Sequence, residues 1–391
     1  MGIKEKALSL HKKLKGKIEV SSKIPIKSTK ILTLLYTPGV AEVSKEISKN
    51  KNSVYEYTSK WNSVAIVTDG SRLLGLGNVG PEAALPVMEG KSVLFKIFGG
   101  VDAIPICLKT QNAKEIIQTA KNISPTFGAI NIEDIDSPKC FEIVESLEKM
   151  LDIPVFHDDK DGTAVVTLAA LINAAKLVKK KIKNLKIVVG GAGAAGHGIT
   201  KILYDYGLRN LIVVDSKGII FRGRRNLDKY KKELSAITNK NNVEGNLEDA
   251  LKGADVFIGV TGKGNLLNKS HVRKMSKRAI VFALSNPDPE ILPKEAKKGG
   301  ARIIATGRSD FPNQVNNSLI FPGIFRGILD ARARKINNEI MMRSALTLSK
   351  LVHGKLGKNN ILPKTTDKNM HKKIAKVVYK TAIETKVSRT K

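Results

Sequence analysis

The chain has 391 residues, of which 42% are hydrophobic and 26% are charged, so it is long enough for two domains that each bury a core. Its two cysteines, Cys107 and Cys140, match neither a disulfide framework nor a zinc knuckle. The net charge is +31, but the lysines are dispersed and only 5% of residues are aromatic. The composition predicts a cytoplasmic globular protein that binds neither nucleic acid nor a membrane, with the excess lysine on solvated surfaces.

The first 30 residues are basic and predict one helix followed by an irregular segment that contains Pro25. Tyr36 then precedes a turn at residues 37–39. This turn could hold the phenol at the edge of a cleft. For an isolated tyrosine, packing is the commoner role, so spacing alone does not make Tyr36 catalytic.

Residues 64–80 predict a strand that leads into a glycine-rich loop. Asp69 and Arg72 stand where this strand ends, which is where α/β proteins keep functional groups. Arg72 could bind a substrate carboxylate through two parallel hydrogen bonds. An ordinary surface ion pair with Asp69 is an equally good interpretation of the spacing.

Residues 88–101 contain two lysines beside an apolar segment, Lys91 and Lys96. A lysine that is partly removed from water can have a lowered pKa and act as a general base. Lys91 is at the entrance of the apolar segment and Lys96 lies within it, so both are candidates.

Two successive strands are each expected to end in acidic residues. Glu133 and Asp134 follow the first strand, and Asp158 and Asp159 follow the second. Carboxylates gathered at one edge of a sheet repel one another unless a cation neutralises them, and oxygen ligands favour Mg²⁺ or Mn²⁺ over zinc. Helix N-caps are the alternative, with Asp158 and Asp161 as the best candidates. Two acidic clusters in tandem favour a metal site.

A dinucleotide-binding fingerprint follows a strand predicted at residues 186–189. Gly191, Gly193 and Gly196 have the spacing G-x-G-x-x-G, a helical pattern follows, and a second strand ends at Asp215. The glycines allow a tight turn, close approach of a pyrophosphate, and packing of helix on strand, while the helix N-terminus attracts the phosphates. A glycine-rich turn without a ligand is the weaker alternative.

Coenzyme choice is left open by the residues after Asp215. This acid is placed to accept hydrogen bonds from an adenosine ribose, which favours NAD. Basic residues follow it, and one of them could accommodate the phosphate of NADP. They are Arg222, Arg224, Arg225 and Lys231.

Motifs in a fixed order connect these features. They include YTPGVAE (36–42), VTDGSRLLGLGNVG (67–80), PVMEGKSVLFK (86–96), PTFGAINIEDI (125–135), GGAGAAG (190–196), ALSNPDPE (283–290) and ATGRSDFPNQVNNSLIFPGIFRG (305–327). With these motifs the sequence resembles the malic enzymes of the short prokaryotic type, and the resemblance extends from about residue 32 to 335.

The resemblance implies an α/β fold with an N-terminal malic-enzyme domain at residues 1–155. A doubly wound Rossmann-type domain that binds NAD or NADP is expected at 156–391, together with the C-terminal helices. The helical pattern after Gly323 is expected to fold back on the first domain. A homodimer is the expectation for this family.

The resemblance also implies residue roles. Lys91, rather than Lys96, is the general base, and Tyr36 is the acid that protonates the enol product. Glu133, Asp134 and Asp159 hold the metal, with Asp158 beside Lys91. The remaining implied contacts are Arg72, Asn286 and Asn317 for the substrate, and Gly191, Ala192, Gly193, Ala194, Ala195, Gly196, Asp215 and Asn286 for the coenzyme.

One departure from the family pattern is Lys160-Asp161, where short members usually carry Gln-His. Lys160 next to the acidic residues is expected to compete with the metal and weaken its binding.

The implied reaction is the oxidative decarboxylation of malate to pyruvate and CO₂ with NAD or NADP and with Mg²⁺ or Mn²⁺. Oxaloacetate decarboxylation is a further implied activity. Two alternatives stay open: a malolactic lyase that makes lactate on the same scaffold, and a nucleic-acid-binding protein with a vestigial site.

Overall fold

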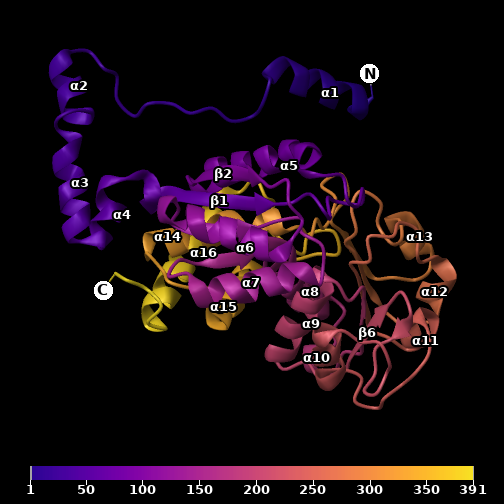
Figure 1. The fold of residues 1–391 in the computed structure, drawn as a ribbon. Helices are drawn as coiled ribbons and strands as arrows, with labels where there is room; N and C mark the ends of the chain where they lie inside the picture. Colours follow the sequence, from indigo (N-terminus) through magenta and orange to yellow (C-terminus); the bar gives the residue numbers. More distant parts are fainter. Residues whose placement is uncertain (1, 391) are drawn as a thin grey trace.

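The computed structural model describes residues 2–390 and contains two sheets whose strands are covered by helices (Figure 1). The first sheet is parallel and has the order β2-β1-β3-β4, with β1 Ser63–Thr68, β2 Asp102–Cys107, β3 Ala129–Ile132 and β4 Val155–His157. The second has the order β10-β9-β8-β5-β6-β7, with β5 Ile187–Gly190, β6 Leu211–Asp215, β7 Gly218–Ile219, β8 Val256–Gly259, β9 Ile280–Ala283 and β10 Ile303–Thr306. Only β7 in this second sheet is antiparallel to its neighbour. The predicted α/β fold with a doubly wound second sheet is confirmed.

The longer helices of the first part are α1 Ile3–Leu14, α2 Thr29–Leu35, α3 Val40–Lys49, α5 Pro81–Leu94, α6 Ala113–Ile123, α7 Lys139–Met150 and α8 Thr163–Leu177. The second sheet is accompanied by α9 Ala194–Asp205, α10 Lys229–Ile237 and the short helices α11 Leu247–Leu251, α12 Lys269–Arg273 and α13 Pro293–Lys298. The chain ends with α14 Phe321–Asp330, α15 Asn338–Lys350 and α16 Lys368–Glu384.

Both sheets lie inside the molecule. Every residue of β1, β5, β8 and β9 is buried, as expected for parallel strands with helices on both faces. The helix α8 is buried along most of its length and packs against α9 and α15. A central core is therefore shared between the two sheets.

The C-terminal helices return to the first sheet, as the sequence predicts. Phe321 and Phe325 of α14 lie 4.6 and 4.9 Å from Phe95, measured between ring centroids. Phe325 also packs edge-on against Phe156 of β4, at 5.6 Å. This aromatic cluster joins α14 to β4 and to the segment that follows α5.

The N-terminal arm, defined here as residues 2–50, lies apart from the body (Figure 1). The helices α1, α2 and α3 contain no buried residue. A contact with the body is made at Lys17, whose ammonium donates to the Pro86 carbonyl of α5 at 2.7 Å. The arm therefore forms helices without a core of its own.

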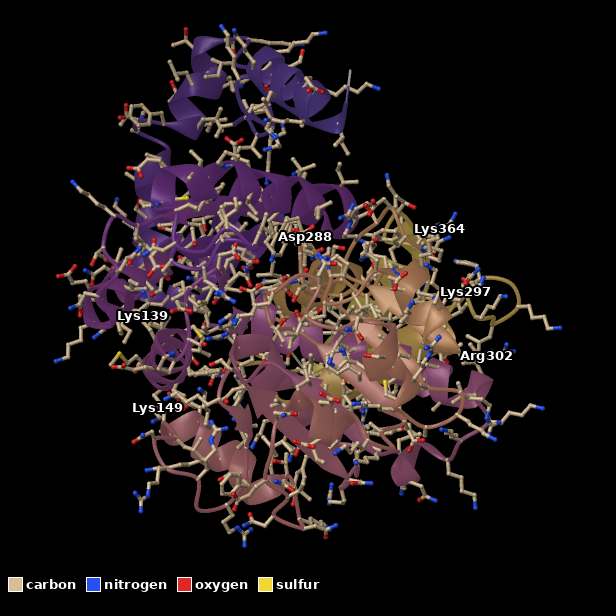
Figure 2. All side chains as sticks on the ribbon, turned by 90° about the vertical axis from the view of Figure 1, so that its right-hand side faces the viewer. Lys139, Lys149, Asp288, Lys297, Arg302 and Lys364 are labelled. Carbon is tan, nitrogen blue, oxygen red and sulfur yellow. The ribbon has the colours of Figure 1, made fainter. Side chains whose placement is uncertain are left out.

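Basic side chains are spread over the molecule. Figure 2 shows Lys139 and Lys149 on one side of the body and Lys297, Arg302 and Lys364 on the other. Among the residues that the structure describes, no helix is both long enough and apolar enough to cross a membrane.

Candidate active site

A cavity of about 640 Å³ lies where loops from both sheets meet. The sequence-predicted residues among its lining are Arg72, Lys91, Glu133, Asp134, Asp159, Gly193, Ala194, Ala195, Asn286 and Asn317. The other predicted coenzyme contacts are not among the lining residues: Gly191 and Ala192 are in the adjoining turn, Gly196 is in α9, and Asp215 ends β6. Most of the predicted site is thus assembled in one place.

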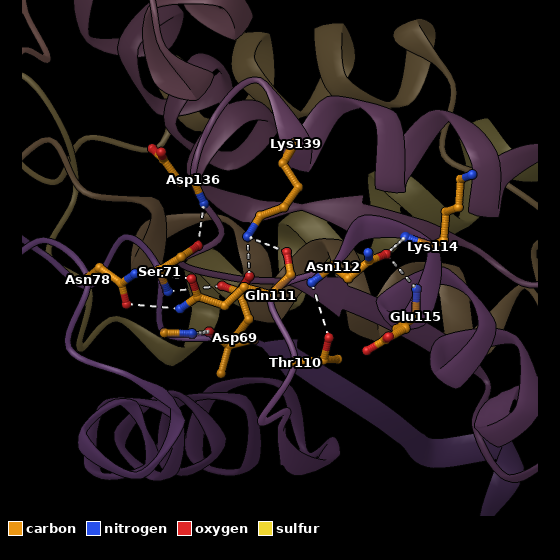
Figure 3. Close-up of polar contacts among 12 residues, drawn as sticks. Asp69, Ser71, Asn78, Thr110, Gln111, Asn112, Lys114, Glu115, Asp136 and Lys139 are labelled. Carbon is orange, nitrogen blue, oxygen red and sulfur yellow. Dashed lines mark hydrogen bonds and ion pairs between the residues drawn. The ribbon is translucent and has the colours of Figure 1, made fainter.

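The loops that follow β1 and β3 are tied together by hydrogen bonds and an ion pair (Figure 3), and both contribute residues to the cavity, Arg72 from the first and Asp136 from the second. Asp69 is fully buried and accepts from the Lys139 ammonium at 2.5 Å and from the Ser71 amide at 2.9 Å. The Ser71 hydroxyl accepts from the Asp136 amide at 2.9 Å. The partner of Asp69 is therefore Lys139, and Arg72 lines the cavity instead of pairing with Asp69.

Arg72 reaches from the first sheet toward the second. Its amide donates to the Asp134 carbonyl at 3.0 Å, which fixes the loop against the acidic residues. Its guanidinium approaches Gly262, where an added Cβ would lie 2.7 Å from Nη2. A planar cation in this position can bind a carboxylate between the two halves.

Lys91, in the last turn of α5, is the buried lysine of the cavity. Its ammonium donates to Asp158 at 2.6 Å and to Glu133, and it lies 4.8 Å from the centroid of the Phe321 ring. Lys96 instead has a side chain that is 63% exposed and pairs with Asp102. Geometry therefore separates the two candidates, since only Lys91 faces the acidic residues.

The expected lowering of the Lys91 pKa is wrong for this arrangement. Burial alone would lower it, but Asp158 and Glu133 beside the ammonium outweigh burial and raise the pKa above its usual value. Sequence spacing could not reveal how many carboxylates converge on this one amine.

The carboxylates themselves are crowded. Burial, with Asp159 as the next contribution, raises the pKa of Asp134 to about 8. Burial likewise raises the pKa of Glu133 well above its usual value and that of Asp158 to about 6, against the opposing effect of Lys91. Negative charge is costly here, so the cluster favours a compensating cation.

A divalent metal fits this donor set by its chemistry. Glu133, Asp134 and Asp159 offer hard carboxylate oxygens, and one oxygen of Asp158 is buried without a hydrogen-bond partner. Within residues 2–390 no three acidic, histidine or cysteine side chains already converge as a metal site. Glu133 is engaged by Lys91, and Asp159 accepts from the Asp134 amide at 3.0 Å.

The alternative role of the acids as helix caps is wrong. The N-cap of α8 is Gly162 and that of α7 is Pro138, and neither helix has a side-chain cap. Gly162 leaves room for the Asp158 carboxylate, because an added Cβ at residue 162 would lie 1.9 Å from it.

Lys160 and Asp161 are the two residues that depart from the family pattern. The Lys160 ammonium pairs with the Asp161 carboxylate at 3.3 Å. Asp161, with a further contribution from Glu148, raises the pKa of Lys160 despite its burial. The ammonium thus has carboxylate neighbours other than the three predicted metal ligands, which argues against strong competition with the metal.

The glycine-rich turn has the geometry that the fingerprint predicts. Gly191 has φ of 106°, a conformation that favours glycine. An added Cβ at Gly196 would lie 1.8 Å from the Gly191 carbonyl oxygen, so helix and strand can pack only with glycine there. Gly193 and the first residues of α9 line the cavity, where the helix N-terminus can receive a phosphate group.

Glu290 organises the loops that follow β8 and β9. It is fully buried, and it accepts from the amide and hydroxyl of Thr261 at 2.8 and 2.9 Å and from the Ser285 hydroxyl at 2.5 Å. These contacts hold the loop that presents Asn286 to the cavity. Glu290 belongs to the motif ALSNPDPE, yet sequence reasoning gave it no role.

Tyr36 is the one predicted catalytic residue outside the cavity. It ends α2 on the N-terminal arm, and 66% of it is exposed. Within one chain the predicted acid and the predicted base are therefore not brought together. Sequence reasoning also missed Lys139 and Phe321, because their partners are distant in sequence.

Comparison with known proteins gives matches over nearly the whole chain. Residues 15–115 match the family model described as malic enzyme, N-terminal domain, and residues 161–383 match malic enzyme, NAD binding domain. The chain is 51% identical over 391 residues to the bifunctional malic/malolactic enzyme of Bacillus subtilis, covering 100% of this chain and 95% of that protein. It is 41% identical over 405 aligned residues to the NADP-dependent malic enzyme of Halomonas elongata, covering 99% of this chain and 95% of that protein. The crystal structure of an NAD-dependent malic enzyme from Thermotoga maritima superposes with a TM-score of 0.92 at 47% identity, covering 95% of this chain and 98% of that one.

Proposed function

The chain belongs to the malic enzyme family, and from this premise we propose that it converts malate to pyruvate and CO₂ while NAD or NADP is reduced. The observation that carries the proposal is the single cavity that contains Lys91, the acidic cluster and the glycine-rich turn. A hydride donor, an acid–base residue and a coenzyme must meet in such a reaction, and this cavity has room for them.

In the proposed reaction Arg72 binds a carboxylate of malate, and Asn286 and Asn317 orient the substrate from the opposite wall. Lys91 can act as the base only as a neutral amine, so a cation at the acidic cluster would have to offset the carboxylates that raise its pKa. The neutral amine then takes the proton of the C2 hydroxyl as the C2 hydride leaves for the nicotinamide ring. The C3–C4 bond then breaks, and CO₂ leaves. Closure between the two halves would keep water from the enol.

Glu133, Asp134 and Asp159 are the residues that we propose to hold Mg²⁺ or Mn²⁺. The ion, when bound, supplies a Lewis acid that stabilises negative charge on the C2 oxygen. Lys91 bridges Glu133 and Asp158, which places the base beside the proposed ligands.

Protonation of the enol at C3 is assigned to Tyr36, and this requires a second copy of the chain. More than half of the large apolar side chains that are exposed among the described residues lie before residue 41, which is unusual for a monomer. We propose a homodimer in which the arm of one copy packs on the other and brings Tyr36 to the partner's cavity. This arrangement accounts for the exposed apolar side chains of the arm and for the position of Tyr36 outside the cavity of its own chain.

The test of the reaction is the absorbance of reduced nicotinamide in purified protein with malate, Mn²⁺ and either NAD or NADP. Reduction that depends on malate and metal, with pyruvate as product, is the expected result. Because one relative is named a bifunctional malic/malolactic enzyme, lactate is measured in the same mixtures. Lactate without net reduction would replace the oxidative proposal by the malolactic one, and the absence of any product would refute both.

A further inference from the structure

Glu290 is a fully buried acid to which the proposed reaction gives no part. It follows β9 in the chain and is not among the residues that line the cavity. Its carboxylate nevertheless contacts both loops that reach the cavity from β8 and β9. Glu290 can therefore act on a bound ligand only through the groups that it holds.

The contacts begin where the pairing of the strands ends. β8 and β9 keep the parallel pattern up to Val260 and Leu284, whose amides donate to carbonyls of the neighbouring strands β5 and β8 at 2.8 and 2.9 Å. The next amides along the chain are those of Thr261 and Ser285, and they donate to Glu290 at 2.8 and 3.2 Å. One carboxylate thus satisfies the first amide beyond the ladder on two adjacent strands.

Two hydroxyl groups extend this arrangement toward the cavity. Those of Thr261 and Ser285 donate to one oxygen of Glu290 at 2.9 and 2.5 Å. The Ser285 hydroxyl in turn accepts from the Gly262 amide at 2.8 Å. An ionised carboxylate offers acceptors only, so Glu290 suits all four of its neutral donors at once.

The two loops lie on the nicotinamide side of the expected coenzyme path. In the second sheet, β8 and β9 lie on the side of β5 that is opposite to β6. The turn after β5 receives the pyrophosphate, and the end of β6 lies by the adenosine ribose. A dinucleotide that crosses this turn therefore brings its other half to the loops after β8 and β9. Gly262 and Asn286 of these loops line the same cavity as Lys91.

The same two loops also meet the first half of the molecule at close range. An added Cβ at Gly262 would lie 2.7 Å from the Arg72 guanidinium, and one at Gly75 would lie 2.6 Å from the Asn286 carbonyl oxygen. A shift of either loop would therefore change the spacing between the coenzyme wall and the substrate wall of the cavity.

We propose that Glu290 is a positioning residue for the nicotinamide half of the coenzyme, because it fixes Gly262 and Asn286 through Thr261 and Ser285. The inference rests on the proposed function, since it concerns the coenzyme of that reaction. The adenosine half binds at the turn after β5 and at the end of β6, which Glu290 does not contact. Loss of Glu290 therefore affects the two halves of the coenzyme differently.

The first experiment measures binding of two ligands to Glu290→Gln by calorimetry. One is the coenzyme, NAD or NADP, that the wild-type protein binds more tightly, and the other is ADP, which contains only the adenosine half. In either orientation the glutamine directs its NH₂ group at a buried donor, so at least one donor loses its acceptor. We expect the coenzyme to bind on the order of tenfold more weakly, the usual effect of one hydrogen bond to a charged group. Binding of ADP should stay as in the wild-type protein.

Glu295→Gln is the matched control, because Glu295 pairs with Lys298 on α13 and does not line the cavity. It should leave the affinities for both ligands unchanged. An equal loss of coenzyme and ADP binding in Glu290→Gln would overturn the proposal, since it would show that Glu290 supports the domain as a whole. Unchanged binding of both ligands would overturn it as well.

Thr261→Val keeps the proposal testable if Glu290→Gln does not fold. Valine is similar in shape to threonine, and the substitution removes one hydroxyl donor to Glu290 at a residue that is not among those lining the cavity. We expect weaker binding of the coenzyme, by a smaller factor than in Glu290→Gln, and unchanged binding of ADP. A coenzyme affinity equal to that of the wild-type protein would then overturn the proposal.

These binding measurements require neither malate nor turnover, so the two proposals can fail separately. If the wild-type protein reduces neither coenzyme but Glu290→Gln selectively weakens coenzyme binding, the reaction fails and the positioning role stands. If the wild-type protein reduces a coenzyme with malate but the variant affects coenzyme and ADP alike, the positioning role fails and the reaction stands.

Discussion

The cavity and the N-terminal arm have opposite characters in the same chain. Around the cavity, Lys91, Glu133 and Asp158 are buried and bonded to one another by contacts within the chain. On the arm, α1, α2 and α3 bury nothing, and Tyr36 is exposed. The proposed base is thus positioned by contacts within the chain, whereas the proposed acid lies on an exposed surface.

This difference has an energetic reason. The buried lysine and carboxylates are costly to desolvate, and only the packed core of the body can hold them in place. The arm has no such core, and its apolar side chains gain stability only when another surface covers them. The buried residues of the cavity and the exposed residues of the arm can each be tested separately by mutation.

The largest effect is expected for Lys91→Ala. Loss of the proposed base should reduce malate oxidation by roughly 10³-fold, within the range of general acid–base catalysis. Lys96→Ala is the control, because Lys96 is exposed and pairs with Asp102 outside the cavity. Turnover is measured by coenzyme reduction, with circular dichroism to confirm folding. Equal activity in the two variants would remove Lys91 from the mechanism.

Tyr36→Phe should reduce turnover by roughly 10²- to 10³-fold, because it removes the proposed acid from every site. The decisive measurement is made on a mixture with Lys91→Ala after dissociation and reassembly. If arms pair with the partner's cavity, mixed dimers contain one intact site, and activity returns to roughly a quarter of the wild-type value. A mixture that stays as inactive as its components would place Tyr36 and Lys91 in the same chain's site.

A smaller effect is expected when the arm is made more polar. Leu34 and Leu35 are 66% and 45% exposed, and we expect each to contribute about 2 kcal/mol when buried against a partner. Replacing both by glutamine keeps the helix propensity of α2 and should weaken the dimer, as measured by sedimentation over a dilution series. Met150→Gln, which changes an exposed apolar residue of the body, is the control. A dimer that resists the double substitution does not use this surface.

The sequence predicts the parts of the molecule that depend on neighbours along the chain. The glycine-rich turn, β6 and its terminal Asp215 are found where their patterns place them. The expectation of a lowered Lys91 pKa is wrong because this pKa depends on how many acids from distant parts of the sequence lie beside the ammonium.

Two further features escape prediction for a related reason. The exposure of Tyr36 depends on which tertiary contacts the arm makes, and no periodicity in the sequence indicates those contacts. The pairing of Asp215 with both Arg224 and Lys231 depends on how the segment after β7 folds back. Tertiary contacts, rather than local preferences, decide each of these cases.

The smallest effect on turnover is expected for Lys139→Met, because Lys139 is not among the residues that line the cavity. Figure 3 shows its contact with Asp69. Lys139 neutralises the buried Asp69, and the same network holds the loop that carries Arg72. Removing the ammonium leaves a buried carboxylate with only its amide partner and should cost about 2 kcal/mol of unfolding free energy, since Lys139 itself is partly exposed.

Because Arg72 is proposed to bind the substrate, the loosened loop should raise the KM for malate more than it lowers kcat. Lys149→Met removes the same charge from an exposed position of α7 and should change neither quantity. A fall in kcat with an unchanged KM would mean that the network supports Lys91 and the acids rather than Arg72. An arm-dependent loss of dimer in Lys139→Met would be unexpected, because Lys139 lies in the body that folds within one chain.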